Sequence, residues 1–178
     1  MKILIVVDMQ NDFVTGVLGT KEAIAVVPKV KERILNGMAQ GEAVLFTRDT
    51  HEQNYLETQE GKRLPVPHCI RGTEGWEIVD ALQGYAINTA PIDKPAFGSL
   101  DLCGILQIID GQTSIEKITL VGLCTDICVI SNAMLLKAAL PEAEIAVDAS
   151  CCAGVTPESH NTALAAMEAC QISIENRS

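Results

Sequence analysis

The stretch that decides the fold reads KILIVVDMQNDF and covers residues 2–13. Its apolar, β-branched run ends abruptly at Asp8 and a polar turn. Runs of this kind are typical of strands that are buried on both faces of a parallel sheet. Five further runs resemble it, so the strands predicted from the sequence cover residues 2–9, 43–48, 86–92, 118–123, 144–147 and 172–175.

Segments with helical periodicity separate these runs. We expect helices over residues 21–38, 75–82, 100–109, 126–140 and 157–170. Thr156 followed by Pro157 and Glu158 is a typical helix start, and Gly37 and Gly41 are candidate ends for the first helix. Strands that alternate with helices predict an α/β fold, a three-layer αβα sandwich with a mainly parallel six-stranded sheet. We expect residues 1–178 to form a single domain, because the chain shows no linker or repeat.

Composition excludes several classes of function. The net charge of −10 argues against a nucleic-acid partner, because such binding depends on Lys and Arg neutralising phosphates. No apolar stretch approaches the ~20 residues of a membrane span, and the first run reads as a strand rather than a signal peptide. We therefore expect a cytoplasmic protein without a membrane partner. Seven cysteines form no disulfide pattern, so most are expected to be buried, and one or two to be chemically active.

Chemically versatile side chains collect where the predicted strands end. Ligand sites of open α/β sheets lie beyond the carboxyl ends of the strands. Asp8 lies at the end of the first strand, Asp49 and His51 follow the second, Lys94 follows the third and Cys128 follows the fourth. The long irregular stretch 50–74 follows the second strand, and such loops commonly carry function.

Cys128 is the candidate nucleophile. It lies in the first turn of the predicted helix 126–140, where the helix dipole favours the thiolate and lowers the thiol pKa. Cys124 is the alternative, but it precedes the helix. Asp8, desolvated at a strand end, would have a raised pKa suited to proton transfer. Lys94 would complete a set of nucleophile, base and orienting group. The competing interpretations, from position alone, are that Cys128 is a buried structural cysteine, Asp8 an acid that caps a loop, and Lys94 a surface lysine.

Asp49, His51 and His68 indicate a metal site. Residues two apart on an extended segment project to the same side, so Asp49 and His51 could share one cation with His68. Mixed nitrogen and oxygen ligands suit Zn²⁺, with Fe²⁺ or Mn²⁺ as alternatives. The competing interpretation is that these groups form hydrogen bonds that pin the long loop.

Five segments together resemble one family. They read IVVDMQNDF (residues 5–13), TRDTH (47–51), HCIRGT (68–73), KPAF (94–97) and GLCTDICV (122–129). In this order they resemble the isochorismatase-like cysteine hydrolases, and within these the nicotinamidases, over essentially the whole chain. The resemblance implies the isochorismatase-like hydrolase fold, a homo-oligomer and a metal-assisted amidase that converts nicotinamide, or a similar heteroaromatic amide, to the acid and ammonia.

The resemblance also implies individual roles. Cys128 would attack the amide carbonyl to form a thioester, Asp8 would transfer protons, and Lys94 would hold Asp8. The backbone N–H groups of Cys124 and Cys128 would form the oxyanion hole, with a cis peptide bond between Leu123 and Cys124. Remaining expectations concern the metal and the substrate: a divalent ion on Asp49, His51 and His68, a further ligand from Glu57 or Glu60, and ring contacts from Phe13, Phe97 or Tyr55.

Two alternatives stay open at this point. The same scaffold could hydrolyse another small amide, a carbamoyl compound or an enol ether. A non-catalytic thiol redox or binding protein would use Cys124, Cys128 or the pair Cys151 and Cys152, but it would leave Asp8 and Lys94 without a purpose.

Overall fold

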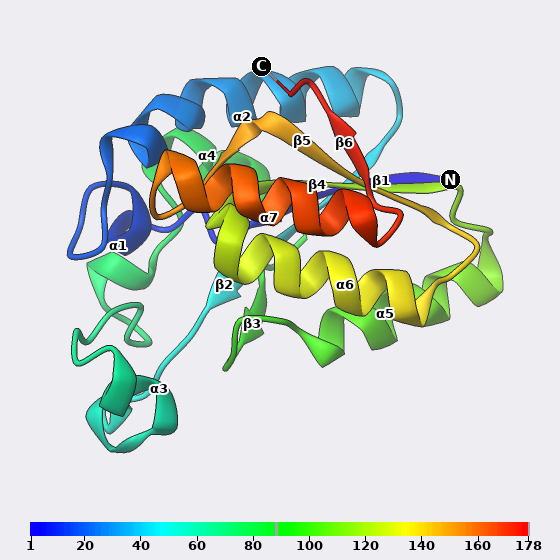
Figure 1. Ribbon diagram of the computed structural model, residues 1–178. Helices are drawn as coiled ribbons and strands as arrows, with labels where there is room; N and C mark the ends of the chain where they lie inside the picture. Colours follow the sequence, from blue (N-terminus) through cyan, green and yellow to red (C-terminus); the bar gives the residue numbers. More distant parts are fainter. Residues whose placement is uncertain (88, 178) are drawn as a thin grey trace.

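Figure 1 shows the computed structural model of the chain, which describes residues 1–87 and 89–177. One sheet has the strand order β3-β2-β1-β4-β5-β6, and every described pairing in it is parallel. The strands are β1 (Lys2–Val7), β2 (Ala43–Asp49), β3 (Ile92–Lys94), β4 (Lys117–Leu123), β5 (Glu144–Ala153) and β6 (Ser173–Glu175). The parallel six-stranded sheet predicted from the apolar runs is therefore confirmed.

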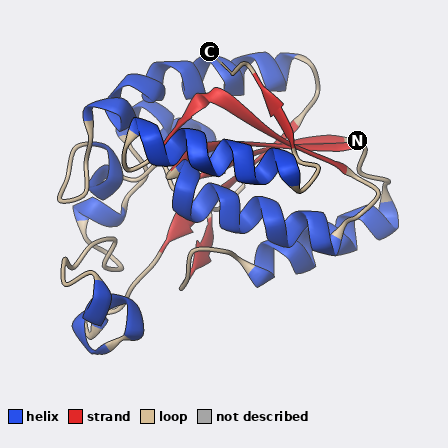
Figure 2. Ribbon diagram, viewed as in Figure 1, coloured by secondary structure: helices blue, strands red, loops and turns tan. Residues whose placement is uncertain are grey.

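Helices cover both faces of this sheet (Figure 2). On one face lie α1 (Asn11–Val14), α2 (Lys21–Ala39) and α4 (Asp80–Ala86), whose apolar residues pack with alternate residues of β1, such as Leu4 and Val6. On the other face lie α5 (Leu100–Gln112), α6 (Ile130–Ala139) and α7 (Pro157–Ala169), which pack with Ile3 and Ile5. Successive residues of β1 thus feed two separate cores, as the three-layer prediction requires.

Local signals set the helix boundaries as the sequence predicts. The Thr156 hydroxyl accepts a hydrogen bond from Ser159 N at 3.1 Å, which caps α7. Thr20 caps α2 in the same way through Ala23 N at 3.0 Å. The helix ends at Ala39, so Gly37 lies inside it and is not its end, whereas Gly41 follows with a φ of +79°, a left-handed conformation that favours glycine.

The expected strand over residues 86–92 was wrong. The helix α4 runs to Ala86, and β3 begins only at Ile92, while position 88 lies outside the described residues. Leu82 and Ala86 are both buried, and they lie one helical turn apart, so the apolar residues of this segment follow the helical period rather than the alternation of a strand. The third strand is consequently shorter and lies later in the chain, and it ends at Lys94, which was expected to follow it.

The fifth strand is longer than expected. It continues past residue 147 to Ala153, so Cys151 and Cys152, which lie beyond the predicted end, are buried strand residues. A shift in the register with β4, between Leu120 and Gly122, accommodates the added length. The burial of Cys151 and Cys152 in β5 is sufficient to explain why cysteine occurs at these two positions.

Irregular regions contain more structure than the sequence suggested. The stretch 50–74 includes the short helices η1 (Tyr55–Glu57) and α3 (Gln59–Arg63), which project from the body of the protein (Figure 1). The helix expected over residues 75–82 divides into η2 (Glu74–Trp76) and α4, and the one expected over 126–140 begins with the π-helical turn η3 (Thr125–Val129) before α6. Within the described residues, we find no helix with the length and apolar character needed to span a bilayer.

Candidate active site

The carboxyl ends of β1, β2, β3 and β4 lie side by side, and they bring the predicted site residues together. Asp8 directly follows β1, and Asp49 and Lys94 end β2 and β3, where they occupy paired positions in the register. Cys128 lies in η3, the turn that follows β4. Four segments far apart in the sequence thus contribute one group each because parallel strands present their ends at one edge.

Lys94 is the centre of this cluster. Its ammonium lies 2.7 Å from Asp8 Oδ2, 3.1 Å from Asp49 Oδ1 and 3.4 Å from Cys128 Sγ. It also donates to Ala96 O at 3.1 Å. Burial lowers the pKa of Lys94, but the surrounding anionic groups outweigh it and raise the pKa. The lysine is therefore a fully buried cation, not the solvated surface lysine of the competing interpretation.

Asp8 is held on several sides. The side chain is fully buried, and the Thr47 hydroxyl donates to its Oδ1 at 2.7 Å. The φ of Asp8 is +46°, a left-handed value uncommon for residues other than glycine, and Gln10 N donates to its carbonyl at 2.8 Å. Burial raises the pKa of Asp8, while Lys94 opposes the rise. A raised pKa agrees with the expectation from its position at a strand end.

The pKa of Cys128 departs from the sequence-based expectation. Burial and the carboxylate of Asp8 raise it, and Lys94 lowers it only in part. The expectation of a lowered pKa was wrong, because complete burial is the largest influence on this thiol and raises its pKa. The resting group is a thiol whose proton needs an acceptor, and Asp8 is the nearby carboxylate. Cys124 also has a raised pKa, of about 12, mainly through burial, and makes no described contact with Lys94.

The turn between β4 and α6 shapes the space around Cys128. The peptide bond between Leu123 and Cys124 is cis, as the resemblance implied. Gly122 precedes it with a φ of +113°, and a Cβ there would collide with Val7 O, so only glycine lets β4 approach β1 this closely. Cys124 O accepts hydrogen bonds from Ile127 N at 3.1 Å and Val129 N at 3.0 Å. These contacts fix the turn that carries both cysteines.

The structure reveals two buried amides that the sequence analysis missed. Asn132 Nδ2 donates to Cys128 O at 2.8 Å and to Phe97 O at 3.1 Å, while its Oδ1 accepts from Ser99 N at 2.9 Å. Its position one turn after Cys128, on the buried face of an apolar helix, is the signal that could have found it.

Gln10 is the second missed amide. Its Oε1 accepts from Asp49 N at 2.7 Å, and its Nε2 donates to Asp49 O at 2.8 Å and to Trp76 O at 2.9 Å. The two bonds to Asp49 tie the ends of β1 and β2 together. The available signal was a glutamine two residues after Asp8, directly behind an apolar run, and the structure shows it fully buried.

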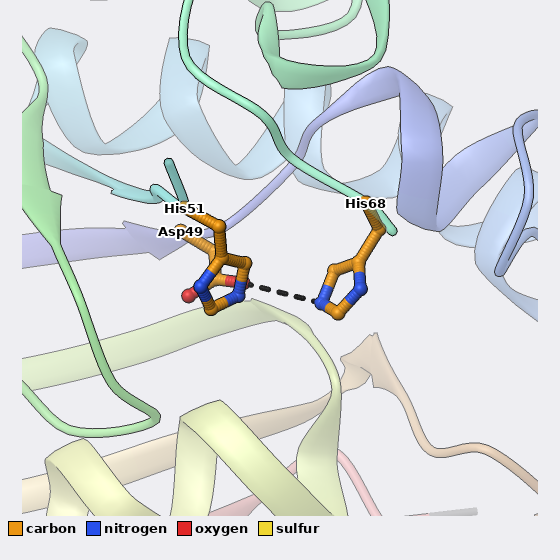
Figure 3. Close-up of side chains that lie close together, drawn as sticks. All are labelled: Asp49, His51 and His68. Atoms are coloured by element: carbon orange, nitrogen blue, oxygen red, sulfur yellow. Dashed lines mark ion pairs between the residues drawn. The ribbon is translucent and has the colours of Figure 1, made fainter. Parts of the chain in front are cut away.

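Figure 3 shows the side chains of Asp49, His51 and His68 turned toward one another. Asp49 Oδ2 lies 3.0 Å from His51 Nε2 and 3.6 Å from His68 Nε2, and one ligand atom from each residue lies within 4.8 Å of the others. All three side chains are buried. This is the donor set that the sequence predicted, gathered around one point.

The donor set fits a divalent metal ion. His51 Nε2 is buried and has no hydrogen-bond partner among the described residues, as expected for a nitrogen that binds an ion. His68 Nδ1 lies 2.8 Å from Val66 O, which leaves Nε2 as its ligand atom. Burial lowers the pKa of His51, but Asp49 and Glu60 outweigh it and raise the pKa to about 9, so the site attracts positive charge.

Of the two glutamates considered for a further ligand, Glu60 approaches the site. Its Oε1 lies 3.5 Å from His51 Nε2 and 3.7 Å from His68 Nε2. Glu57 belongs to η1, and its side chain is exposed. The structure therefore favours Glu60 over Glu57 as a further ligand, a choice that the sequence left open.

A cavity of about 710 Å³ opens beside these groups. Its walls include Asp49, His68, Cys124 and Cys128, together with the apolar side chains of Phe13, Leu18, Leu64, Phe97, Leu123 and Ile127. Phe13 is buried, with its ring centre 5.5 Å from that of His68, whereas Phe97 is 44% exposed. Two of the three aromatic residues considered for ring contacts, Phe13 and Phe97, thus line the cavity.

Tyr55 packs against the two histidines and is not placed to contact a substrate in the cavity. Its ring packs 4.7 Å from His51 and 5.1 Å from His68, centre to centre, and its hydroxyl donates to Leu64 O at 2.9 Å. It is fully buried and is not among the residues that line the cavity. Its position is suited to orienting the two imidazoles.

Comparison with known proteins identifies the class. The isochorismatase domain matches residues 2–176, so the chain belongs to the isochorismatase family. The chain is 28% identical over 164 residues to the nicotinamidase of Schizosaccharomyces pombe, covering 74% of each chain. Its structure is similar to that of the nicotinamidase/pyrazinamidase PncA from Bacillus subtilis, with a TM-score of 0.84, 26% identity and coverage of 98% and 99%. The pyrazinamidase of Pyrococcus horikoshii in complex with zinc gives a TM-score of 0.77, with 26% identity and coverage of 97% of each chain.

Proposed function

We propose that the protein is a cysteine amidohydrolase that converts nicotinamide, or a similar small heteroaromatic amide, to the carboxylic acid and ammonia. The observation that carries the proposal is the buried contact of Lys94 with Asp8 and Cys128 beside the cavity and the Asp49, His51 and His68 cluster. Family membership and the nicotinamidase relatives indicate an amide-bond hydrolase. The relatives' names support the substrate class.

In the first half of the reaction, Cys128 attacks the amide. Asp8 takes the thiol proton as Sγ bonds to the carbonyl carbon, which becomes tetrahedral and gives its oxygen a negative charge. Asp8 then passes the proton to the amide nitrogen, and the carbon–nitrogen bond breaks. Ammonia departs, and the acyl group remains on Cys128 as a thioester. The raised pKa of Asp8 suits a group that first accepts and then donates a proton.

Water completes the cycle in the second half. Asp8 takes a proton from a water molecule, whose oxygen attacks the thioester carbon. The carbon–sulfur bond breaks, the thiolate regains the proton, and the carboxylic acid leaves. Lys94 keeps its proton throughout and stabilises the negative charge wherever it resides, on Asp8 or on Cys128 Sγ.

The turn after β4 supplies the proposed oxyanion hole. The N–H groups of Cys124 and Cys128 would donate to the oxygen of the tetrahedral intermediate. The bonds of Cys124 O to Ile127 N and Val129 N, and that of Cys128 O to Asn132, hold these residues in place before a substrate arrives. Donors aimed in advance in this way are worth ~3 kcal/mol each in the transition state.

Asp49, His51 and His68, with Glu60 beside them, would hold a divalent ion, with zinc as the first candidate. When bound, the ion supplies a Lewis-acid position for a ring nitrogen of the substrate. The chain itself supplies the apolar wall: Phe13 lies against His68 and lines the cavity, so it would contact the ring face.

Ammonia release tests the proposal. The metal-loaded protein is assayed for ammonia with nicotinamide, pyrazinamide and a carbamoyl compound, and for the carbonyl product with an enol ether, whose hydrolysis releases no ammonia. We expect activity on the two heteroaromatic amides, with a loss of at least about a thousandfold in Cys128→Ser. Cys170→Ser is the matched control, because Cys170 is exposed and lies outside the cavity lining. Full activity in Cys128→Ser would refute the mechanism, and hydrolysis of the carbamoyl compound or the enol ether alone would refute the substrate class.

A further inference from the structure

The two carboxylate oxygens of Asp8 have different surroundings. The Thr47 hydroxyl donates to Oδ1 at 2.7 Å. Oδ2 lies 2.7 Å from Lys94 Nζ in an ion pair, and no hydroxyl or backbone N–H of the described residues donates to this buried oxygen. Oδ1 therefore accepts a hydrogen bond from a hydroxyl, whereas Oδ2 keeps a lone pair free beside Lys94.

We infer that Thr47 is a positioning residue that assigns the proton-transfer role to Oδ2 of Asp8. By holding Oδ1, the hydroxyl fixes the rotation of the carboxylate and turns Oδ2 toward Lys94 and the thiol of Cys128. The inference rests on the proton exchange between Asp8 and Cys128 in the proposed function, and it does not depend on which amide is the substrate.

The location of Thr47 supports this role. It lies in β2, adjacent to β1, and is fully buried, as Asp8 is. Most buried positions of a parallel sheet are apolar, and valine would fill this one with nearly the same shape. A hydroxyl at this position needs a hydrogen-bond partner, and an ionised carboxylate can only accept, so the proton between them belongs to Thr47.

The charged and titratable groups around Asp8 come from three other segments. Lys94 faces it from β3, Asp49 lies nearby at the end of β2, and Cys128 faces it from η3. Burial raises the pKa of Asp8, whereas the positive charge of Lys94 and the hydrogen bond from Thr47 favour the ionised form and lower it. Loss of the Thr47 hydroxyl therefore removes one restraint on rotation and also makes the carboxylate hold its proton more tightly.

The test compares Thr47→Val, Thr47→Ser and the unmodified protein, each metal-loaded and checked for folding by circular dichroism. Thr119→Val is the matched control: Thr119 is a buried threonine of β4 that makes no described hydrogen bond to Asp8, Lys94 or Cys128. In the amidase assay we expect Thr47→Val to lower kcat by roughly tenfold or more with little change in KM. Thr47→Ser should recover most of it, and Thr119→Val should leave kcat within about twofold.

A second readout needs no substrate. The rate of alkylation of Cys128 by iodoacetamide, followed by peptide mass spectrometry, is measured against pH. Its acidic limb reports the lower apparent pKa of the Asp8–Cys128 pair. We expect this limb to move to higher pH in Thr47→Val and to return in Thr47→Ser. The inference would be overturned if Thr47→Val left both the acidic limb and kcat unchanged, or if Thr47→Ser had the same defect as Thr47→Val. It would also be overturned if Cys128 did not react with iodoacetamide. Failure of every amide in the panel would refute only the proposed substrate class.

Discussion

Asp49 and Lys94 occupy paired positions at the ends of β2 and β3, and Asp49 Oδ1 lies 3.1 Å from Lys94 Nζ. The other oxygen of the same carboxylate faces His51 at 3.0 Å. One buried carboxylate therefore joins the lysine that contacts Cys128 to the candidate metal ligands. The two parts of the site share a residue, and they should respond together to changes in it.

Replacement of Lys94 should affect stability as well as activity. In Lys94→Met the carboxylates of Asp8 and Asp49 stay buried without their cation, and such a loss costs about 3–5 kcal/mol of unfolding free energy. Urea denaturation measures it, with Lys21→Met as the control because the Lys21 side chain is 90% exposed. A change below about 0.5 kcal/mol, as expected for the control, would mean that the two carboxylates are not ionised together.

The two glutamates of the projecting segment should differ in their effect on metal binding. Glu60→Gln should weaken the binding of a divalent metal by at least about tenfold, because Glu60 lies 3.5 Å from His51 Nε2. Glu57→Gln, a change of an exposed side chain in the same segment, should leave binding unchanged. Titration with zinc, followed by metal analysis after dialysis, gives the comparison. Equal affinities of the two variants would exclude Glu60 from the site, and retention of metal by His68→Ala would exclude the site itself.

Asn132 should matter for both folding and reactivity. Asn132→Leu leaves Cys128 O, Phe97 O and Ser99 N without the partners that they have now, and each buried unpaired group costs about 1–3 kcal/mol. We expect a lower melting temperature and a lower kcat, since the turn that carries Cys128 loses its tie to the segment 97–99. The exposed Asn54 provides the control substitution Asn54→Leu. A variant with normal kcat would show that this tie serves stability alone.

Activity should fall with acid at a higher pH than an ordinary aspartate would dictate. The proposed reaction begins with Asp8 ionised, and burial raises its pKa, so kcat/KM is lost as the pH drops through that raised value. The acidic limb of the kcat/KM profile should therefore lie clearly above about 3.9, the usual pKa of an aspartate. A limb near 3.9 would contradict the assignment of Asp8 as the proton acceptor.

Sequence reasoning placed the main groups because parallel strands end at a common edge. Asp8, Asp49, Lys94 and Cys128 each follow or end a strand, so their proximity needed no knowledge of side-chain contacts. Even with the third strand misplaced at residues 86–92, Lys94 was expected just beyond its end, and Lys94 is the last residue of β3. The positions of the groups are confirmed by the structure, whereas their roles stay predictions.

The remaining features depend on tertiary contacts that no local pattern encodes. The bond from Thr47 to Asp8 requires the register of β2 on β1, and the choice of Glu60 over Glu57 requires the direction in which α3 faces. The raised pKa of Cys128 follows mainly from complete burial, which the sequence does not show. Register, helix orientation and depth of burial are set by the packed molecule as a whole.

The position of β3 at the edge of the sheet has a consequence for unfolding. This strand has three residues and pairs with β2 alone within the described residues, yet it delivers Lys94 to the centre of the site. Short edge elements detach locally before the whole molecule unfolds. Detachment of β3 would remove the cation from Asp8, Asp49 and Cys128 while the central strands stay paired. Catalysis should therefore be the first property that the protein loses in denaturant, well before its overall secondary structure.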